Sequence, residues 1–244
     1  MNYKILSSVL SIVLCIFFIA KNSLDFNPIK FHCDNYTLNS YLYIFLSMAI
    51  MISTIFTLEY KDMDIVKLFT GSSRFLLLVL SIVLIFSLIL LPPKYFFSKH
   101  LVWILWLCNM AVFLYPLYKE NYATFYHSGI STILLVLALS LLAYLKPNMI
   151  SDSWFNYLFI SLIVLFISTI VERLLANWGI IHNKKYSKAL SYISIVLFSL
   201  FLLYDTKNII KNANNCVNPD YINQSLDIVL DSLNIFTNFA NIKE

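Results

Sequence analysis

The sequence has little charge and almost no glycine. Charged residues make up 12% of the 244 residues and hydrophobic residues 60%, whereas a soluble domain carries about 25% charged residues. Mean hydropathy is +0.77. The charges are clustered, and the uncharged stretches between them are long enough to cross a hydrocarbon core of about 30 Å. With three glycines, small-residue packing motifs are absent, so helix contacts must use Ala, Ser and larger side chains. The chain is therefore expected to be an integral membrane protein.

The cysteines, histidines and basic residues exclude other classes of site. The four cysteines contain no CxxC pair, and the four histidines lie far apart, which argues against a zinc site and against a disulfide framework. The net charge of +4 is spread over many loops. Because no basic run is present, we expect no nucleic-acid partner.

Eight apolar stretches predict a bundle of about eight membrane helices. Membrane strands are excluded because no stretch alternates between apolar and polar residues with a period of two. The eight stretches are Ile5–Ala20, Tyr41–Leu58, Phe75–Leu91, Leu101–Tyr118, Phe125–Leu145, Trp154–Val171, Ala189–Tyr204 and Tyr221–Ala240. Pro92-Pro93 and Pro147 are expected to end the third and fifth helices. Lys21–Ser40 is polar and is interpreted as a loop. No internal repeat is evident.

The first stretch has two interpretations. Lys4 followed by an apolar run is typical of a signal peptide. However, Ile5–Ala20 is slightly long for a signal core and no A-x-A cleavage site follows, which favours a retained helix. We therefore divide the chain into an N-terminal hydrophobic segment with a polar loop, residues 1–40, and a seven-helix transmembrane bundle, residues 41–244.

Ionisable residues gather in the last two stretches, where they are functional candidates because charge inside a membrane is costly. Asp205 follows a long apolar run. Asp227, Asp231, Asn234 and Asn238 recur at helical spacing, which puts them on one face of the last helix. That face suits a bundle interior.

Two simpler interpretations compete with a site. The last segment could lie flat on the membrane, but such helices usually carry Lys and Arg on the polar face. Asp205 could mark the end of its helix, but an acidic residue there opposes the helix dipole. Residues 205–211 contain no Gly or Pro, so the helix can continue beyond Asp205.

The more specific hypothesis is a functional site in which Asp205 lies beside Asp231. Two carboxylates in a poorly solvated site share one proton and titrate as a coupled pair. When both are deprotonated, their oxygens suit a hard cation such as Ca²⁺. Protons and the metal ion would then compete for the site.

The C-terminal residues resemble a family signature. Leu203-Tyr204-Asp205-Thr206-Lys207, then Asp220-Tyr221-Ile222 and Leu230-Asp231-Ser232-Leu233-Asn234-Ile235-Phe236 are similar to the C-terminal pattern of the Bax inhibitor motif family. Tyr115-Pro116 and Ser131-Thr132 resemble the family more weakly. The match covers about the last 45 residues, and the rest agrees only as a hydrophobic bundle.

This resemblance implies an all-α membrane protein, a seven-helix bundle around a central last helix, here with Ile5–Ala20 as an extra N-terminal helix. It also implies a pH-sensitive calcium leak channel and suppressor of cell death in an endoplasmic reticulum or Golgi-like membrane, with the plasma membrane as a second location. Asp205 and Asp231 correspond to the family's gating pair, with Asp227 and Asn234 beside them. The nearest counterpart of its basic latch is Lys94, although Lys cannot bind a carboxylate pair in the bidentate manner of Arg. The expected partners are membrane lipids and apoptosis-regulating membrane proteins, with no cofactor besides calcium as the transported or bound ion.

Orientation gives a testable contrast. Lys and Arg are nearly balanced between the two sides, so the positive-inside rule only weakly favours a cytosolic N-terminus. If all eight stretches cross the membrane, Cys33 and Cys216 face the same compartment. The two cysteines can form a disulfide if that compartment is oxidising, whereas the family orientation predicts that they are reduced thiols. Asn35-Tyr36-Thr37 is a glycosylation sequon, and a glycan on it would also contradict the family orientation.

Three other functions compete with the calcium leak channel: a protease, a non-conducting regulator and a transporter. An intramembrane aspartyl protease also needs two aspartates on adjacent helices, but its GxGD element is absent because no glycine follows Gly179; we therefore expect no enzyme. A non-conducting regulator acting through partners would tolerate loss of both aspartates. A secondary transporter would show repeats or broken helices, and neither is visible.

Overall fold

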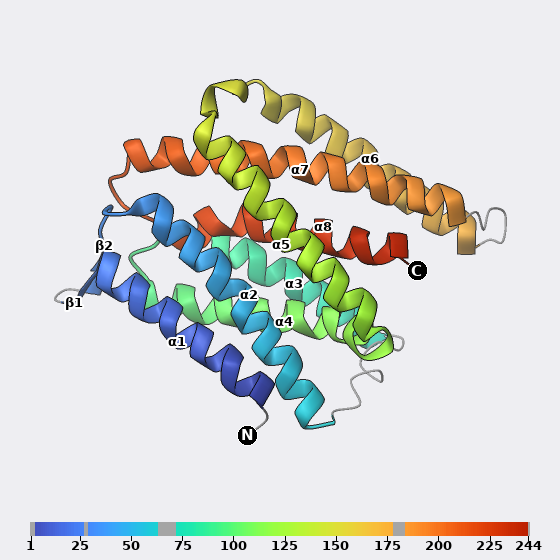
Figure 1. The fold of residues 1–244 in the computed structure, drawn as a ribbon, viewed down its shortest axis with the longest axis horizontal. Coiled ribbons are helices and arrows are strands. Elements are labelled where there is room, and N and C mark those ends of the chain that lie inside the picture. The colour runs from blue at the N-terminus through green and yellow to red at the C-terminus, as the bar shows by residue number, and fades with distance from the viewer. Residues whose placement is uncertain (1–2, 27–28, 63–71, 178–183, 244) are drawn as a thin grey trace. The chain divides into compact units, whose positions relative to one another are not determined.

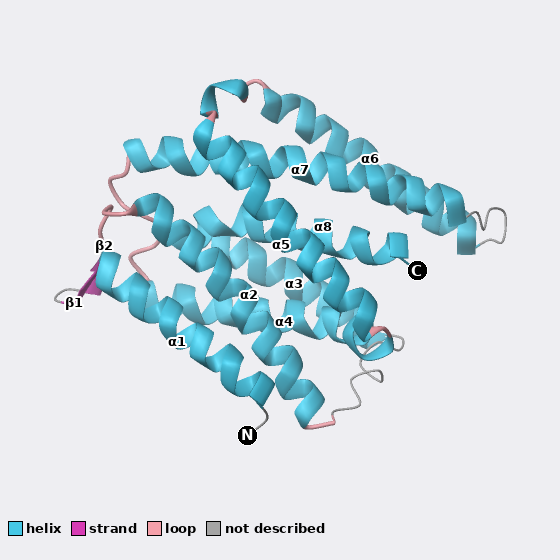
Figure 2. Cartoon of the chain, in the orientation of Figure 1, coloured by secondary structure: helices cyan, strands magenta, loops and turns pink. Residues whose placement is uncertain are grey.

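The computed structural model describes residues 3–26, 29–62, 72–177 and 184–243 (Figure 1). These ranges form helices almost throughout (Figure 2). The elements are α1 (Tyr3–Ser23), β1 (Leu24–Phe26), β2 (Ile29–Phe31), α2 (Tyr36–Tyr60), α3 (Ser72–Leu90), α4 (Phe96–Glu120), α5 (Tyr122–Leu145), a 3₁₀ turn (Pro147–Met149), α6 (Trp154–Asn177), α7 (Lys184–Asn214) and α8 (Tyr221–Lys243). Each helix coincides with one of the eight expected stretches, so the all-α membrane fold with an additional N-terminal helix is confirmed.

The helices differ in how well they suit a bilayer. Among the described residues, six helices are long and apolar enough to cross: α1, α2, α4, α5, α7 and the Trp154–Glu172 part of α6. The apolar part of α3, Phe75–Leu90, is shorter, and α8 is set apart by its polar residues. The chain is therefore a multi-pass membrane protein.

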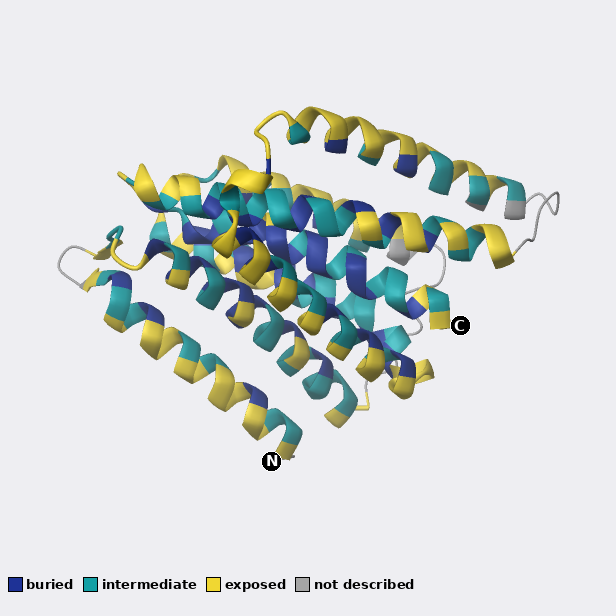
Figure 3. Cartoon of the chain, turned by 45° about the horizontal axis from the view of Figure 1, so that its top comes forward, coloured by how far each residue is buried: buried dark blue, intermediate teal, exposed yellow. Residues whose placement is uncertain are grey.

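Apolar side chains cover the outer surface of several helices. On α1, which begins at the N-terminal label in Figure 3, one face carries exposed Leu6, Leu10, Val13 and Phe17. These residues recur at helical spacing, so they form a continuous apolar stripe. Exposed Ile160, Val164 and Ile167 do the same on α6. Such stripes are compatible with lipid because the helix backbone satisfies its own hydrogen bonds.

Local sequence explains several helix ends. α3 ends just before Pro92-Pro93, and α5 ends two residues before Pro147, as expected for a residue that cannot continue a helix. By contrast, α7 continues through Asp205 to Asn214. The interpretation of Asp205 as the end of its helix is therefore wrong, and its carboxylate belongs to the body of α7.

The expectation that the chain contains no strand, and that Lys21–Ser40 is a loop throughout, is wrong. β1 and β2 pair antiparallel, with Leu24 opposite Phe31 and Asp25 opposite Lys30. Each strand has three residues, which is too short for the alternating pattern that identifies strands in a sequence. The hairpin is instead stabilised by contacts with residues far along the chain.

The chain forms two compact units. Unit 1 contains Met1–Tyr122 and Asn212–Val229, and unit 2 contains Ala123–Lys211 and Leu230–Glu244. In unit 1, α1 packs on α2, and both α2 and α3 pack on α4. In unit 2, α6 and α7 share a core of Leu158, Leu165, Leu197 and Phe201. The division of the chain at residue 40 stays a prediction.

Candidate functional site

The last two helices run antiparallel and are tied near both ends. In unit 1, Asn212 Nδ2 of α7 donates to Gln224 Oε1 of α8 at 2.6 Å. In unit 2, Lys188 Nζ near the start of α7 donates to the carbonyl of Ile242 near the end of α8, at 3.0 Å. Each bond joins α7 to α8 within its own unit.

Asp205 lies within α7 and Asp231 within α8. Asp205 stands seven positions before Asn212 on α7, and Asp231 stands seven positions after Gln224 on α8. Seven residues make about two helical turns, so each aspartate lies on the same face as its hydrogen-bonded neighbour. Asp231 is only 6% exposed and Asp205 is half-buried. Both carboxylates belong to unit 2.

The C-terminal half of α8 packs closely on α5 in unit 2. The rings of Phe125 and Phe236 meet edge to face with centroids 5.1 Å apart. A Cβ built on Gly129 would lie 3.9 Å from the Phe236 ring. Ser128 and Thr132 are also buried on α5. These contacts hold the helix that carries Asp231 in a defined rotation.

The other two candidates on α8 have different surroundings. Asn234 is half-buried, and its Nδ2 donates to the Leu230 carbonyl of its own helix at 2.9 Å. Asp227 is exposed, although sequence spacing puts it one turn from Asp231. The rotation of α8 therefore separates the two aspartates by burial, and Asp231 is the one enclosed by protein.

The expected latch residue does not lie in an enclosed position. Lys94 is exposed, and its Nζ lies over the Tyr95 ring, 5.1 Å from the centroid. The buried lysine is Lys99, which is 2% exposed. Its Nζ pairs with Asp220 Oδ2 at 2.5 Å and donates to the Leu91 carbonyl at 2.7 Å.

The sequence reading missed the Lys99–Asp220 pair, which lies in unit 1. Lys99 lies two residues before the apolar stretch that starts at Leu101, so hydropathy alone places it outside the helix. In the structure, α4 already begins at Phe96. A lysine inside the first turn of a membrane helix needs a partner, and this need is the signal that points to the Lys99–Asp220 pair.

A disulfide joins two loops of unit 1. Cys33, just after β2, bonds to Cys216 in the connection between α7 and α8. Nearby, the Tyr221 hydroxyl donates to the His32 carbonyl at 2.7 Å, and the Phe31 ring meets that of Tyr221. The expectation of reduced thiols from the family orientation is contradicted. The pairing of Cys33 with Cys216, which the eight-crossing topology allows if the compartment is oxidising, is present in the structure.

The arrangement of Asp205 and Asp231 restricts the chemistry available. No group of three or more His, Cys, Asp or Glu side chains suited to a metal gathers anywhere in the described ranges. Ca²⁺ takes 6–8 oxygen ligands in a stable protein site. The carboxylates of Asp205 and Asp231 supply only part of such a ligand set.

Comparisons with known proteins find a matching family and a similar sequence. A family model described as "Inhibitor of apoptosis-promoting Bax1" matches residues 33–243. The growth hormone-inducible transmembrane protein of Rattus norvegicus is 32% identical over 154 residues, which cover 59% of this chain and 43% of that protein. The alignment thus spans less than half of that relative. No solved structure matches the chain.

Proposed function

This chain belongs to the Bax inhibitor family of membrane proteins, and we propose that it acts as a pH-sensitive calcium leak channel that suppresses cell death. The gate in this proposal is the pair Asp205 and Asp231, whose carboxyl groups share a proton when they lie close to each other. Ca²⁺ is the transported ion, and no cofactor or enzymatic activity is included.

The observation that supports the proposal is the burial of two aspartates, from different helices, within unit 2. Asp205 on α7 is half-buried, and Asp231 on α8 is 6% exposed. Buried carboxylates in a membrane protein are retained at a cost, and a pair of them makes a site where protons and a divalent cation compete. A change in pH alters the charge of such a pair and therefore its attraction for Ca²⁺.

The cellular part of the proposal rests on the family. We propose an internal membrane, of the endoplasmic reticulum or Golgi type, as the location. Membrane lipids and apoptosis-regulating membrane proteins are the proposed partners. Calcium leak from an internal store lowers the amount of calcium available for release, which connects the transport activity to survival of the cell.

The test is calcium flux from proteoliposomes between about pH 6 and 8. Wild type is compared with Asp205→Asn and Asp231→Asn, which keep side-chain size and remove the titratable charge. Asp25→Asn, an exposed residue of β1, is the matched control. We expect wild type and the control to leak calcium with the same pH dependence, and both gate variants to alter it.

A second function makes the opposite prediction. A non-conducting regulator acting through protein partners would give no flux above empty liposomes, and its protection of cells would survive both substitutions. Flux that is present but unchanged in Asp205→Asn and Asp231→Asn would assign the pair a structural role and refute the gate.

A further inference from the structure

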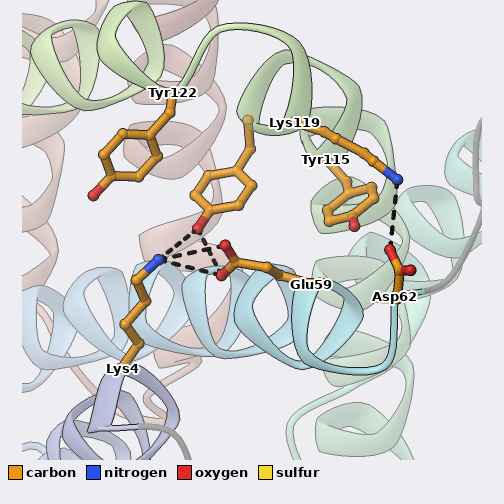
Figure 4. Close-up of a pocket in the computed structure, with 7 residues that line it drawn as sticks. Lys4, Glu59, Asp62, Tyr115, Lys119 and Tyr122 are labelled. Carbon is orange, nitrogen blue, oxygen red and sulfur yellow. Dashed lines mark hydrogen bonds and ion pairs between the residues drawn. The ribbon is translucent and has the colours of Figure 1, made fainter.

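An aromatic and acidic cage surrounds the ammonium group of Lys4 in unit 1 (Figure 4). Lys4 Nζ lies 5.6 Å from the ring centroid of Phe56, 5.8 Å from that of Tyr118 and 5.4 Å from that of Tyr122. It pairs with Glu59 Oε2 at 3.3 Å. α2, α4 and α5 thus each contribute a ring around one positive charge.

The cage is braced by its own hydrogen bonds. The Tyr118 hydroxyl donates to Glu59 Oε2 at 2.7 Å and accepts from Lys4 Nζ at 3.1 Å. Tyr118 is buried, so its ring and the carboxylate it orients are held in place by helix packing. A cation within about 6 Å of several ring faces, next to a carboxylate, is the arrangement with which proteins recognise organic ammonium groups.

The cage and its occupant come from different parts of the chain. Glu59, Phe56, Tyr118 and Tyr122 all lie within the family match, residues 33–243. Lys4 lies on α1, before the match begins. α1 itself is largely exposed and packs on α2. The helix that supplies the cation is therefore an addition to the core that forms the cage.

A cavity adjoins the cage. Its volume is about 340 Å³, and it is lined by Lys4, Glu59, Asp62, Tyr115, Tyr118, Lys119 and Tyr122. That volume is in the range of small-molecule sites, roughly 300–1,000 Å³. Lys119 Nζ lies 3.9 Å from Asp62 Oδ1. The cavity opens where α2 and α4 end and α5 begins, after long apolar runs, which is the level of lipid headgroups in a bilayer.

We infer that this cage is a binding site for an alkylammonium group, and that Lys4 of α1 occupies it as an internal competitor. The ligand is an organic ammonium ion, either the headgroup of a phospholipid such as phosphatidylcholine or a free amine. Binding of the ligand displaces Lys4 and releases the N-terminal end of α1 from α2 and α4. This site is separate from Asp205 and Asp231 and does not depend on calcium transport.

The first experiment titrates tetramethylammonium chloride into the purified full-length protein in a maltoside detergent, which carries no ammonium group. We expect Lys4→Met to bind this probe at least ten-fold more tightly than wild type, because the competitor is gone. Lys21→Met makes the same change at the exposed far end of α1 and should match wild type. Adding Tyr122→Leu to Lys4→Met should weaken binding at least ten-fold. Equal affinity of wild type and Lys4→Met, or no binding by either, overturns the inference.

The second experiment needs no substitution, so it decides the question even if Lys4→Met fails to fold. Acetylation of Lys4 and Lys21 by a succinimidyl ester is followed by mass spectrometry in wild type. We expect Lys4 to react more slowly than Lys21, and its rate to rise several-fold when the cage is taken by a ligand. A rise with tetramethylammonium supports a free amine, and a rise in phosphatidylcholine but not phosphatidylglycerol nanodiscs supports a lipid headgroup. No rise with either, or an equal rise with potassium chloride, overturns the inference.

Discussion

Removing the negative charge of Asp220 should destabilise unit 1, because Lys99 would stay buried without its counter-ion. Asn is the informative replacement. Asp220 Oδ1 accepts the Asn223 backbone N–H at 3.2 Å at the start of α8, and Asn caps a helix about as well as Asp. Asp220→Asn therefore keeps the cap and removes only the ion pair with Lys99.

The magnitude follows from burial. Removing one partner of a fully buried pair costs about 3–5 kcal/mol. Asp220 is 24% exposed on its side chain, whereas Lys99 is 2% exposed, so water reaches one side of the pair and screens part of the interaction. We therefore expect a loss of roughly 2–4 kcal/mol. At about 2–4 °C per kcal/mol for a chain of this size, Tm should fall by about 4–16 °C.

The assay is thermal unfolding in detergent, read by a fluorogenic maleimide. Cys15 and Cys108 are unpaired and only partly accessible, so they report unfolding as they become exposed. The double variant Lys99→Met with Asp220→Asn removes both charges and should recover at least half of the lost Tm. Asp25→Asn, exposed on β1, should leave Tm unchanged. If Asp220→Asn unfolds at the wild-type temperature, or the double variant is less stable than Asp220→Asn alone, the reasoning about a buried charge is refuted.

Three more predictions follow from the loops. The loops that carry Cys33 and Cys216 should face an oxidising compartment, the lumen of an internal membrane. A membrane-impermeant maleimide should label both cysteines only after the membranes are permeabilised and the disulfide is reduced. Labelling without reduction would contradict the disulfide, and labelling of reduced protein in sealed vesicles would contradict the luminal location. Asn35 is exposed beside Cys33, so in cells with N-glycosylation the chain should gain one glycan that Asn35→Gln removes; an unshifted wild-type band would contradict this orientation. Lys207 donates to Asp152 at 2.6 Å and holds the pKa of Asp152 below its usual range. The stability from this pair is therefore fully present above the pKa of Asp152 in the unfolded chain, about 4. It is lost as the pH falls through the lower pKa of Asp152 in the folded protein. The Tm difference between wild type and Asp152→Asn should accordingly be small at pH 7 and vanish in acid, and a difference that grows in acid would reverse the sign of this linkage.

The elements themselves were largely predictable from the sequence. A membrane helix is determined by local features: an apolar run of sufficient length, and hydrogen bonds that close within a few residues. Eight such runs became eight helices, and Pro92 and Pro147 lie just beyond the ends of α3 and α5. The absence of Gly and Pro after Asp205 likewise indicated a continuous α7. The three-residue strands escaped detection because they are too short to show a period.

The candidate gate was predictable only in part. Helical spacing and the family resemblance pointed to Asp205 and Asp231, since both signals are local to the last helices. Helical spacing alone did not distinguish Asp231 from Asp227, because the two aspartates are one turn apart and differ only in how α8 is rotated against its neighbours; the resemblance pointed to Asp231. Burial of Asp231 and exposure of Asp227 are results of packing.

The long-range partners were decided by tertiary structure alone. Lys4 meets Glu59 across 55 residues and Lys99 meets Asp220 across 121, while the disulfide joins cysteines 183 residues apart. Hydropathy determines which segments become membrane helices because the bilayer acts on each segment separately. It does not determine which helices become neighbours or how each is rotated. Those choices depend on the fit of side chains between helices, and they created the ion pair, the disulfide and the cage around Lys4.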